Sequence, residues 1–176
     1  LAELKLSDED LEYIASLGFE PEFVEHLRGL RFTGTMRAVA EGTFVFPGEP
    51  IITLVGPIEE LTYVEARILN IVNPQTLVAT KAFRVVEAAE GDPVIEMGLR
   101  RAQGGDASIY HSRAAYIAGV DSTSNLEAGR LFGIPARGTH AHALVMLGGD
   151  EKEAFRLWAQ SQVKLGRRPT FLIDTY

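Results

Sequence analysis

The chain has 176 residues, of which 46% are hydrophobic and 23% are charged, and its formal net charge at pH 7 is -7. This composition is typical of a globular protein, and the acidic balance argues against an extended nucleic-acid-binding surface. The chain contains no cysteine, which excludes disulfides, thiolate metal sites and cysteine nucleophiles within these residues. No apolar run approaches the roughly 20 residues needed to span a bilayer, and the start has no signal-peptide pattern, so we expect a cytoplasmic protein with neither membrane nor nucleic acid as a partner.

The first part of the chain, residues 1–91, predicts a domain of helices and short strands. Ser7 and Asp10 stand at capping-box positions at the start of a predicted helix, and Pro21 stands at the start of a second. Residues 34–57 are rich in β-branched and aromatic residues and are interrupted by glycine and proline. That pattern predicts short strands joined by tight turns.

The second part of the chain predicts an α/β fold. It follows two linking helices, expected at residues 59–70 and 74–89, which complete the first part. From there the pattern alternates between strand and helix, and it ends in a strand at residues 169–176. Such alternation implies parallel strands in an α/β layer or barrel. We therefore expect two domains, residues 1–91 and 92–176.

Polar side chains collect where the predicted strands end. Parallel α/β folds build their sites at the carboxyl ends of strands, because the loops there face one side. We therefore expect these polar clusters to share one rim. They are Glu96 with Arg100 and Arg101; Asp121 to Asn125; Thr139 with His140 and His142; and Asp174 with Thr175.

Arg100 and Arg101 suggest an anionic ligand, because guanidinium groups match the geometry of phosphate and carboxylate. The alternative is that each is a surface arginine paired to an acidic side chain. The segment "DSTSN" (residues 121–125) also suits an anion at a helix N-terminus. Serine and asparagine are ordinary helix caps, however, and capping is the better interpretation of this segment taken alone.

Two of the four histidines, His140 and His142, lie close together in "GTHAHALVM". In an extended segment, positions two apart face the same way, so both rings are expected to point into the site. A metal site would need further ligands, and the other histidines are too few and poorly placed. A nucleophilic imidazole that accepts a phosphoryl group is the more economical interpretation, with a packed core histidine as the alternative.

Taken together, these motifs resemble those of the nicotinate phosphoribosyltransferase family. The resemblance runs in family order from about residue 31 to the last residue. The family chain is longer, and its earlier stacking tyrosine and its later glycine-rich phosphate loop have no counterpart here, so we expect a partial chain. The resembling segments are "GTFVFPGEPIITLVGP", "NPQTLVATKAFRVVEAA", "EMGLRRAQG", "DSTSN", "LFGIP", "GTHAHALVM" and "FLIDTY".

The resemblance implies a strand-rich α+β N-terminal domain packed on an irregular parallel α/β barrel that is incomplete here. It implies a homodimer with active sites at the subunit interface. It also implies that nicotinate and phosphoribosyl pyrophosphate give nicotinate mononucleotide and pyrophosphate. Mg²⁺ would be the cofactor and ATP a co-substrate, hydrolysed through a phosphohistidine. No metal ligand is assigned to this chain.

The resemblance further implies roles for individual residues. His142 takes the place of the phosphohistidine in the family pattern Gly-Thr-x-Ala-His, and His140 stands at its variable position. Arg100, with Arg101 beside it, matches an arginine that holds the ribose phosphate or the nicotinate carboxylate. The other expected contacts are Met97 against the pyridine ring, Ser124 beside the ring carboxylate, Gly138 and Thr139 around the phosphohistidine, and Asp174 at the last strand end.

Three alternatives stay open. A nicotinamide-using phosphoribosyltransferase is the nearest, although such relatives carry an acid where Ser124 stands. A metal-dependent hydrolase would use His140 and His142 as an H-x-H pair. A lipoyl or biotin carrier is suggested by the hairpin texture of residues 42–57, but this stretch lacks the lysine that carriers need.

Overall fold

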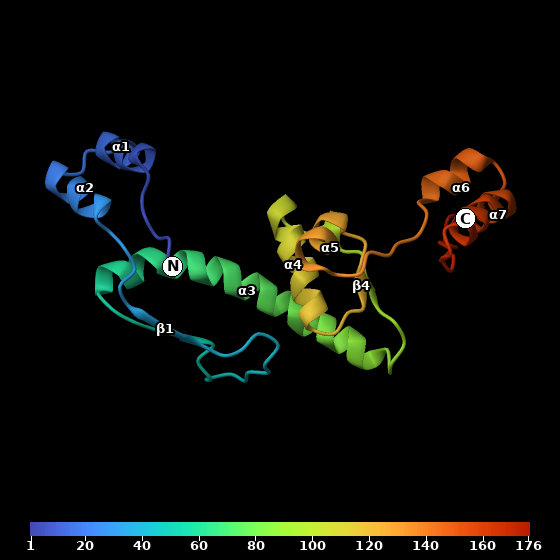
Figure 1. The fold of residues 1–176 in the computed structure, drawn as a ribbon, viewed down its shortest axis with the longest axis horizontal. Helices are drawn as coiled ribbons and strands as arrows, with labels where there is room; N and C mark the ends of the chain where they lie inside the picture. The colour runs from blue at the N-terminus through green and yellow to red at the C-terminus, as the bar shows by residue number, and fades with distance from the viewer. The chain divides into compact units, whose positions relative to one another are not determined.

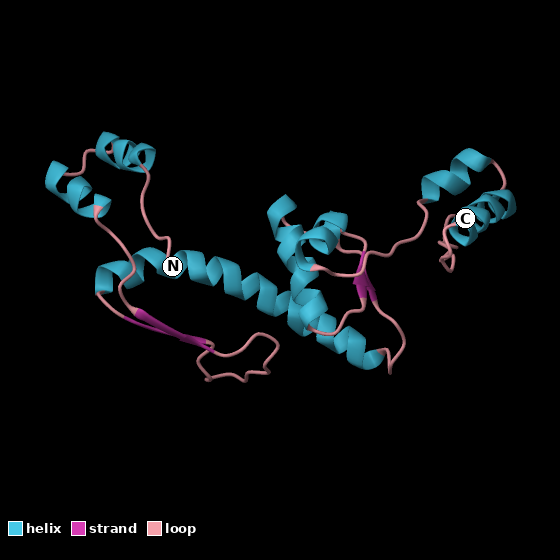
Figure 2. Ribbon diagram, viewed as in Figure 1, coloured by secondary structure: helices cyan, strands magenta, loops and turns pink.

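The computed structural model describes residues 1–176 and divides into two compact units, Leu1–Pro74 and Gln75–Tyr176. Figure 1 follows the chain by colour from its first residue to its last. Helices dominate both units, and the strands form two small pairs (Figure 2). The chain is therefore α/β with small sheets. The domain boundary expected after residue 91 stays a prediction.

Two short helices begin the first unit, and their caps are those that the sequence predicts. In α1 (Asp8–Ser16) the Asp10 N–H donates to Ser7 Oγ at 3.1 Å, and the Ser7 N–H donates to Asp10 Oδ2 at 2.9 Å. The helix α2 (Pro21–Arg28) has its proline in the first turn. Apolar side chains of this region form a small core, which consists of Leu6, Leu11 and Leu30 with Ile14, Val24 and Leu27 packed against them.

A β-hairpin follows, in which β1 (Thr35–Ala38) and β2 (Ile52–Val55) pair antiparallel. Gly34 precedes the hairpin, and a Cβ there would lie 2.6 Å from the Val55 carbonyl oxygen, so only glycine fits. Buried Glu60 accepts both the N–H of Thr33 at 2.6 Å and its hydroxyl at 2.8 Å. This carboxylate ties the chain before the hairpin to the helix after it.

The two linking helices expected at residues 59–70 and 74–89 are one helix, α3 (Ile58–Ala88), with Pro74 inside it. The prediction of a break was wrong because a proline removes a single N–H donor, and the good helix formers on both sides continue the turn. Neither α3 nor any other helix is apolar enough over a sufficient length to cross a membrane.

The second unit contains the parallel pair that strand–helix alternation predicts. In this pair β3 (Ile95–Glu96) lies beside β4 (Ser122–Thr123), and Thr123 also bridges to Ala136 in parallel. The turn η1 (Leu99–Arg101) and the helices α4 (Gly105–Ile117) and α5 (Leu126–Phe132) surround the pair. The buried apolar side chains of this second unit are Ala114, Ala115, Val120, Ala128, Ile134, Val145 and Ala154.

The strands expected around the histidines and at residues 169–176 are absent. The segment after Ala141 is the helix α6 (His142–Gly148), which is followed by α7 (Glu151–Lys164). A continuous apolar run of this length does not distinguish strand from helix, so periodicity misled the prediction. Residues 169–176 have no neighbouring strand, and the Leu172 N–H instead donates to the ring of His140.

Candidate functional site

The ends of β3 and β4 bring three of the polar positions together. Because the strands are parallel, both carboxyl ends lie at the same edge. The Ser124 N–H donates to the Glu96 carbonyl oxygen at 2.9 Å. Met97 directly follows β3 and leaves 42% of its surface exposed. Of the four polar clusters expected on one rim, the structure brings two together at this edge, through Glu96 and Ser124.

The carboxylate of Glu96 is the centre of a hydrogen-bond network at this edge. It accepts the hydroxyl of Ser112 at 2.8 Å and that of Thr123 at 2.5 Å, and it also accepts the Gly98 N–H. A Cβ at Gly98 would lie 2.8 Å from the carboxylate, so a side chain there would push it aside. Through Gly98, which precedes η1, the network fixes the turn that carries the arginines.

Arg100 and Arg101 lie in η1, and both are exposed. Neither guanidinium takes part in an ion pair, so the alternative of two surface salt bridges is not observed. Five N–H donors on each side chain remain available. The turn therefore presents two positive charges that could hold a phosphate or a carboxylate.

The capping interpretation of residues 121–125 is confirmed for Asn125. Its side-chain oxygen accepts the Ala128 N–H at 3.3 Å, and its amide nitrogen donates to Ser112 Oγ at 3.3 Å. Ser124 is not part of this cap and is partly exposed. Its hydroxyl is therefore free to contact a ligand at the strand edge.

A second group of predicted residues forms around His142, the first residue of α6. Its Nδ1 lies 3.1 Å from Thr175 Oγ1, and its Nε2 lies 3.7 Å from Asp174 Oδ1. The side chain is 40% exposed, so the ring is held by neighbours and still accessible.

His140 does not share this environment, and the expectation that both rings face the same way was wrong. That expectation assumed an extended segment, but the chain turns into a helix at His142. His140 is buried, with 5% of its surface exposed. Both of its ring nitrogens have backbone partners, Ala141 and Leu172, which leaves no free nitrogen for an H-x-H metal pair. No group of three or more histidine, aspartate and glutamate side chains is arranged to hold a metal.

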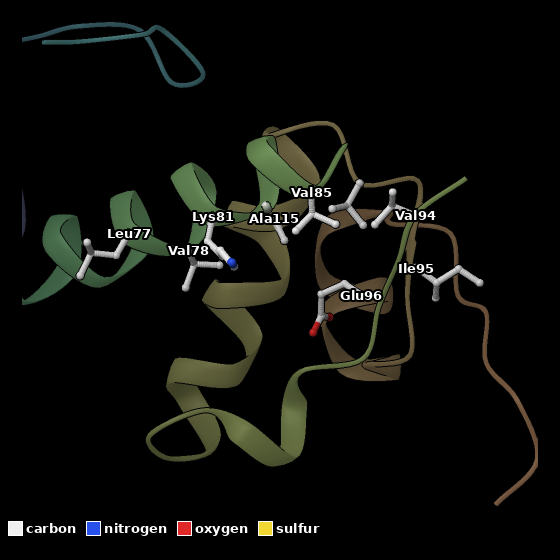
Figure 3. A pocket seen from close by; sticks show the side chains of 10 residues that line it. Leu77, Val78, Lys81, Val85, Val94, Ile95, Glu96 and Ala115 are labelled. Atoms are coloured by element: carbon white, nitrogen blue, oxygen red, sulfur yellow. The ribbon is translucent and has the colours of Figure 1, made fainter. Parts of the chain in front are cut away.

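An apolar hollow of about 390 Å³ lies between the second half of α3 and the elements β3 and α4 (Figure 3). Val78, Val85 and other aliphatic side chains line it, and Lys81 and Glu96 are its charged residues. None of the residues predicted to bind substrate lines the hollow. It is therefore separate from the proposed ligand contacts.

Comparison with known proteins identifies the family. Residues 1–73 match the nicotinate phosphoribosyltransferase (NAPRTase) N-terminal domain. Nicotinate phosphoribosyltransferases of Mycobacterium tuberculosis and Bacillus subtilis are each 44% identical to this chain over 177 aligned positions, which cover 100% of it. The chain belongs to the nicotinate phosphoribosyltransferase family.

Solved structures of related proteins resemble this one. The crystal structure of human nicotinic acid phosphoribosyltransferase matches 81% of this chain with a TM-score of 0.74 and 41% identity, and the match covers 29% of the human chain. The nicotinate-nucleotide pyrophosphorylase of Pyrococcus furiosus matches 71% with a TM-score of 0.65 and 31% identity, which covers 32% of that chain. This chain spans 37% and 35% of the mycobacterial and Bacillus relatives.

Gly138 and Thr139, which the family resemblance places around His142, lie in the loop before α6. The Thr139 hydroxyl donates to the His140 carbonyl oxygen at 2.8 Å. A Cβ at Gly138 would meet nothing within 4 Å, so this structure places no steric demand on that glycine. Their contact with substrate or phosphate stays a prediction.

Sequence reasoning missed the buried partners of these groups. Ser112 supports Glu96 from α4, and Phe155 and Trp158 surround His140 from α7. The spacing of Phe155 and Trp158 places them on one helix face, which is a detectable signal. Nothing in the sequence, however, indicates that this face covers a histidine.

Proposed function

We propose that the protein transfers the phosphoribosyl group of phosphoribosyl pyrophosphate to nicotinate, forming nicotinate mononucleotide and pyrophosphate. The observation that carries the proposal is 44% identity, along the whole chain, to enzymes named for this activity. The strand edge with its two unpaired arginines agrees with substrates that are all anions.

The anionic parts of the substrates bind at the edge formed by β3 and β4. Arg100 and Arg101 take the ribose phosphate or the nicotinate carboxylate in bidentate hydrogen bonds. Ser124 donates its hydroxyl to the ring carboxylate, where an acidic side chain would repel it. Met97 lies against the pyridine ring.

The transfer itself needs little covalent chemistry from the protein. The pyridine nitrogen forms a bond to the anomeric carbon of the ribose while the bond from that carbon to pyrophosphate breaks. Positioning of the two substrates and stabilisation of the departing charge by arginine supply most of the rate. Mg²⁺ is carried by the substrate phosphates, as is usual for this ion, and it neutralises part of their charge.

ATP hydrolysis is coupled to the transfer through a phosphoryl group on His142. Its imidazole is accessible, and Thr175 Oγ1 at 3.1 Å from Nδ1 orients the ring. With Nδ1 held by Thr175, the Nε2 lone pair bonds the terminal phosphorus of ATP while the bond from that phosphorus to ADP breaks, and water later hydrolyses the N–P bond to release phosphate. Asp174 Oδ1 lies 3.7 Å from Nε2. The negative phosphoryl group then favours the binding-competent state of the site, with Gly138 and Thr139 beside it.

The remaining parts of the proposal concern assembly. Residues 92–176 form the first part of an irregular α/β barrel. The enzyme is a cytoplasmic homodimer with its sites at the subunit interface. The homodimer is tested by the mass of the full-length protein in solution.

The His142→Ala variant of the full-length protein tests the proposed chemistry. Without an imidazole no phosphoryl group can be accepted, so stimulation of nicotinate mononucleotide synthesis by ATP is expected to be lost. The measurement compares product formed from nicotinate, phosphoribosyl pyrophosphate and Mg²⁺ with and without ATP.

The matched control is His26→Ala, which removes an exposed histidine that pairs only with Glu59 on the surface. This control is expected to retain the ATP stimulation of the unmodified protein. Unchanged stimulation in His142→Ala would contradict the assignment of His142, and use of nicotinamide in preference to nicotinate would contradict the proposed substrate.

A further inference from the structure

His140 lies in an aromatic cage that its neighbour His142 does not share. The centroid of its ring is 5.3 Å from that of Phe155, 5.7 Å from Trp158 and 6.4 Å from Phe171. The edge-on arrangement of Trp158 and Phe171 is a favourable one for aromatic rings. A side chain held in this way has one orientation, and its two nitrogens point at fixed partners.

Those partners define the protonation state of the ring. Nδ1 lies 3.2 Å from the Ala141 carbonyl oxygen, which can only accept, so Nδ1 carries the proton. Nε2 lies 3.1 Å from the Leu172 nitrogen and accepts its N–H. The ring therefore donates from Nδ1 and accepts at Nε2, and its one lone pair is occupied by the backbone. The ring has no free nitrogen with which to attack a phosphate.

The hydrogen bond from the Leu172 N–H is one of several contacts that anchor residues 170–172. One residue earlier, the ring of Phe171 packs on Phe155 at 5.2 Å. Two residues earlier, the Trp158 indole N–H donates to the Thr170 carbonyl oxygen at 3.0 Å. These contacts hold residues 170–172 against α7 without a neighbouring strand.

The anchored segment continues directly to the groups that contact His142. Thr175 lies three residues after Leu172, and its Oγ1 is 3.1 Å from His142 Nδ1. His140 lies two residues before His142 in the same loop. His140 is thus joined to the ring of His142 in two ways, directly along the chain and through the anchored residues 172–175.

We propose that His140 is a positioning residue, which fixes the imidazole of His142 by anchoring residues 170–175 through the Leu172 N–H. The catalytic meaning of this inference rests on the proposed function of His142. The anchor itself is a separate property that can be measured without any reaction.

Two substitutions of His140 in the full-length protein separate packing from hydrogen bonding. His140→Phe fills the cage but cannot accept the Leu172 N–H, whereas the amide oxygen of His140→Gln can. In His140→Phe, hydrogen exchange of the Leu172 amide is expected to accelerate about 5- to 30-fold, which corresponds to one lost hydrogen bond to a buried acceptor. His140→Gln is expected to retain most of the protection.

Single-turnover transfer of label from radiolabelled ATP to His142 provides the catalytic readout. Its rate is expected to fall about 5- to 30-fold in His140→Phe, because the ring of His142 spends less time in the reactive orientation. The KM for ATP is expected to change less than about twofold, since His140 does not touch the nucleotide. His140→Gln restores the rate.

A second pair of variants keeps the inference testable if His140→Phe does not fold. Thr175→Val removes the hydroxyl beside His142 and leaves the anchor intact, and Thr175→Ser keeps the hydroxyl. The Val variant is expected to slow labelling while Leu172 stays protected, and the Ser variant is expected to label normally.

The outcomes are distinguishable. If the unmodified protein takes label from ATP, a normal labelling rate in His140→Phe or in Thr175→Val would overturn only the positioning role. An equal loss of labelling rate in His140→Phe and His140→Gln would also overturn the positioning role, because an acceptor for the Leu172 N–H would then make no difference. An unmodified protein that takes no label from ATP would overturn the proposed function of His142, and an unprotected Leu172 amide in that protein would overturn the anchor.

Discussion

A single carboxylate, that of Glu96, connects the ends of both strands to the arginine turn. It accepts the Gly98 N–H and two hydroxyls, from Ser112 and Thr123, which are almost fully buried. Donors to a charged acceptor form the stronger class of hydrogen bond. The sequence places Glu96 at a strand end. Its two hydroxyl partners, Ser112 and Thr123, lie 16 and 27 residues away along the chain, and only the packing of α4 on the strands brings them to the carboxylate.

Glu96→Gln is expected to destabilise the protein by about 1–3 kcal/mol, because one acceptor oxygen becomes an amide nitrogen and leaves a donor unpaired. It should also weaken binding of phosphoribosyl pyrophosphate, since the turn that carries Arg100 and Arg101 loses its support. Urea unfolding and calorimetric titration measure the two effects.

Glu59→Gln is the control for this substitution. Glu59 is 57% exposed and pairs with His26 at the surface, so a change within about 0.5 kcal/mol is expected. Equal stability of the two variants would contradict the supporting role of Glu96.

At the scale of whole elements, local signals predicted the starts of α1 and α2 but neither the continuity of α3 nor the start of α6. The capping box of Ser7 and Asp10 and the proline of α2 are where the sequence indicates. Pro74 suggested a break that the structure does not have, because the pattern of the surrounding residues remains helical. The start of α6 at His142 was missed, because an apolar run without alternation fits a strand as well as a helix.

The cap of α1 makes its stability depend on pH. The Ser7 hydroxyl and backbone N–H donate to Asp10 and lower the pKa of that carboxyl below its ordinary value of 3.8. Because the pKa is lower in the folded state, the charged carboxylate stabilises the fold above pH 3.8, and this contribution is lost as the pH falls through the lowered pKa.

Asp10→Asn is therefore expected to lower the melting temperature at neutral pH and to match the unmodified protein in strong acid. Thermal unfolding followed by circular dichroism at the two pH values checks this. Glu9→Gln removes a charge from the same helical turn without a bond to Ser7, and it should show a smaller difference. A pH-independent effect of Asp10→Asn would refute the role of its charge.

At the scale of the whole molecule, the predicted site residues gather in two groups. Parallel pairing predicted that Glu96 and Ser124 would be neighbours, because strand ends of a parallel sheet share an edge. The group of His142 with Thr175 and Asp174 could be anticipated only as polar residues at the ends of apolar runs. The burial of His140 could not be anticipated from the sequence, because it depends on the fold of α6 and α7 around the ring.

The most direct test of the proposed chemistry is to locate the phosphoryl group after the full-length protein reacts with labelled ATP. Tryptic cleavage after Arg137 and after Lys152 releases a peptide, residues 138–152, that contains both His140 and His142. Fragmentation of this peptide by mass spectrometry distinguishes the two rings. We predict an acid-labile phosphoryl group on His142 and none on His140. A group on His140, or on neither ring while product formation still depends on ATP, would contradict the account.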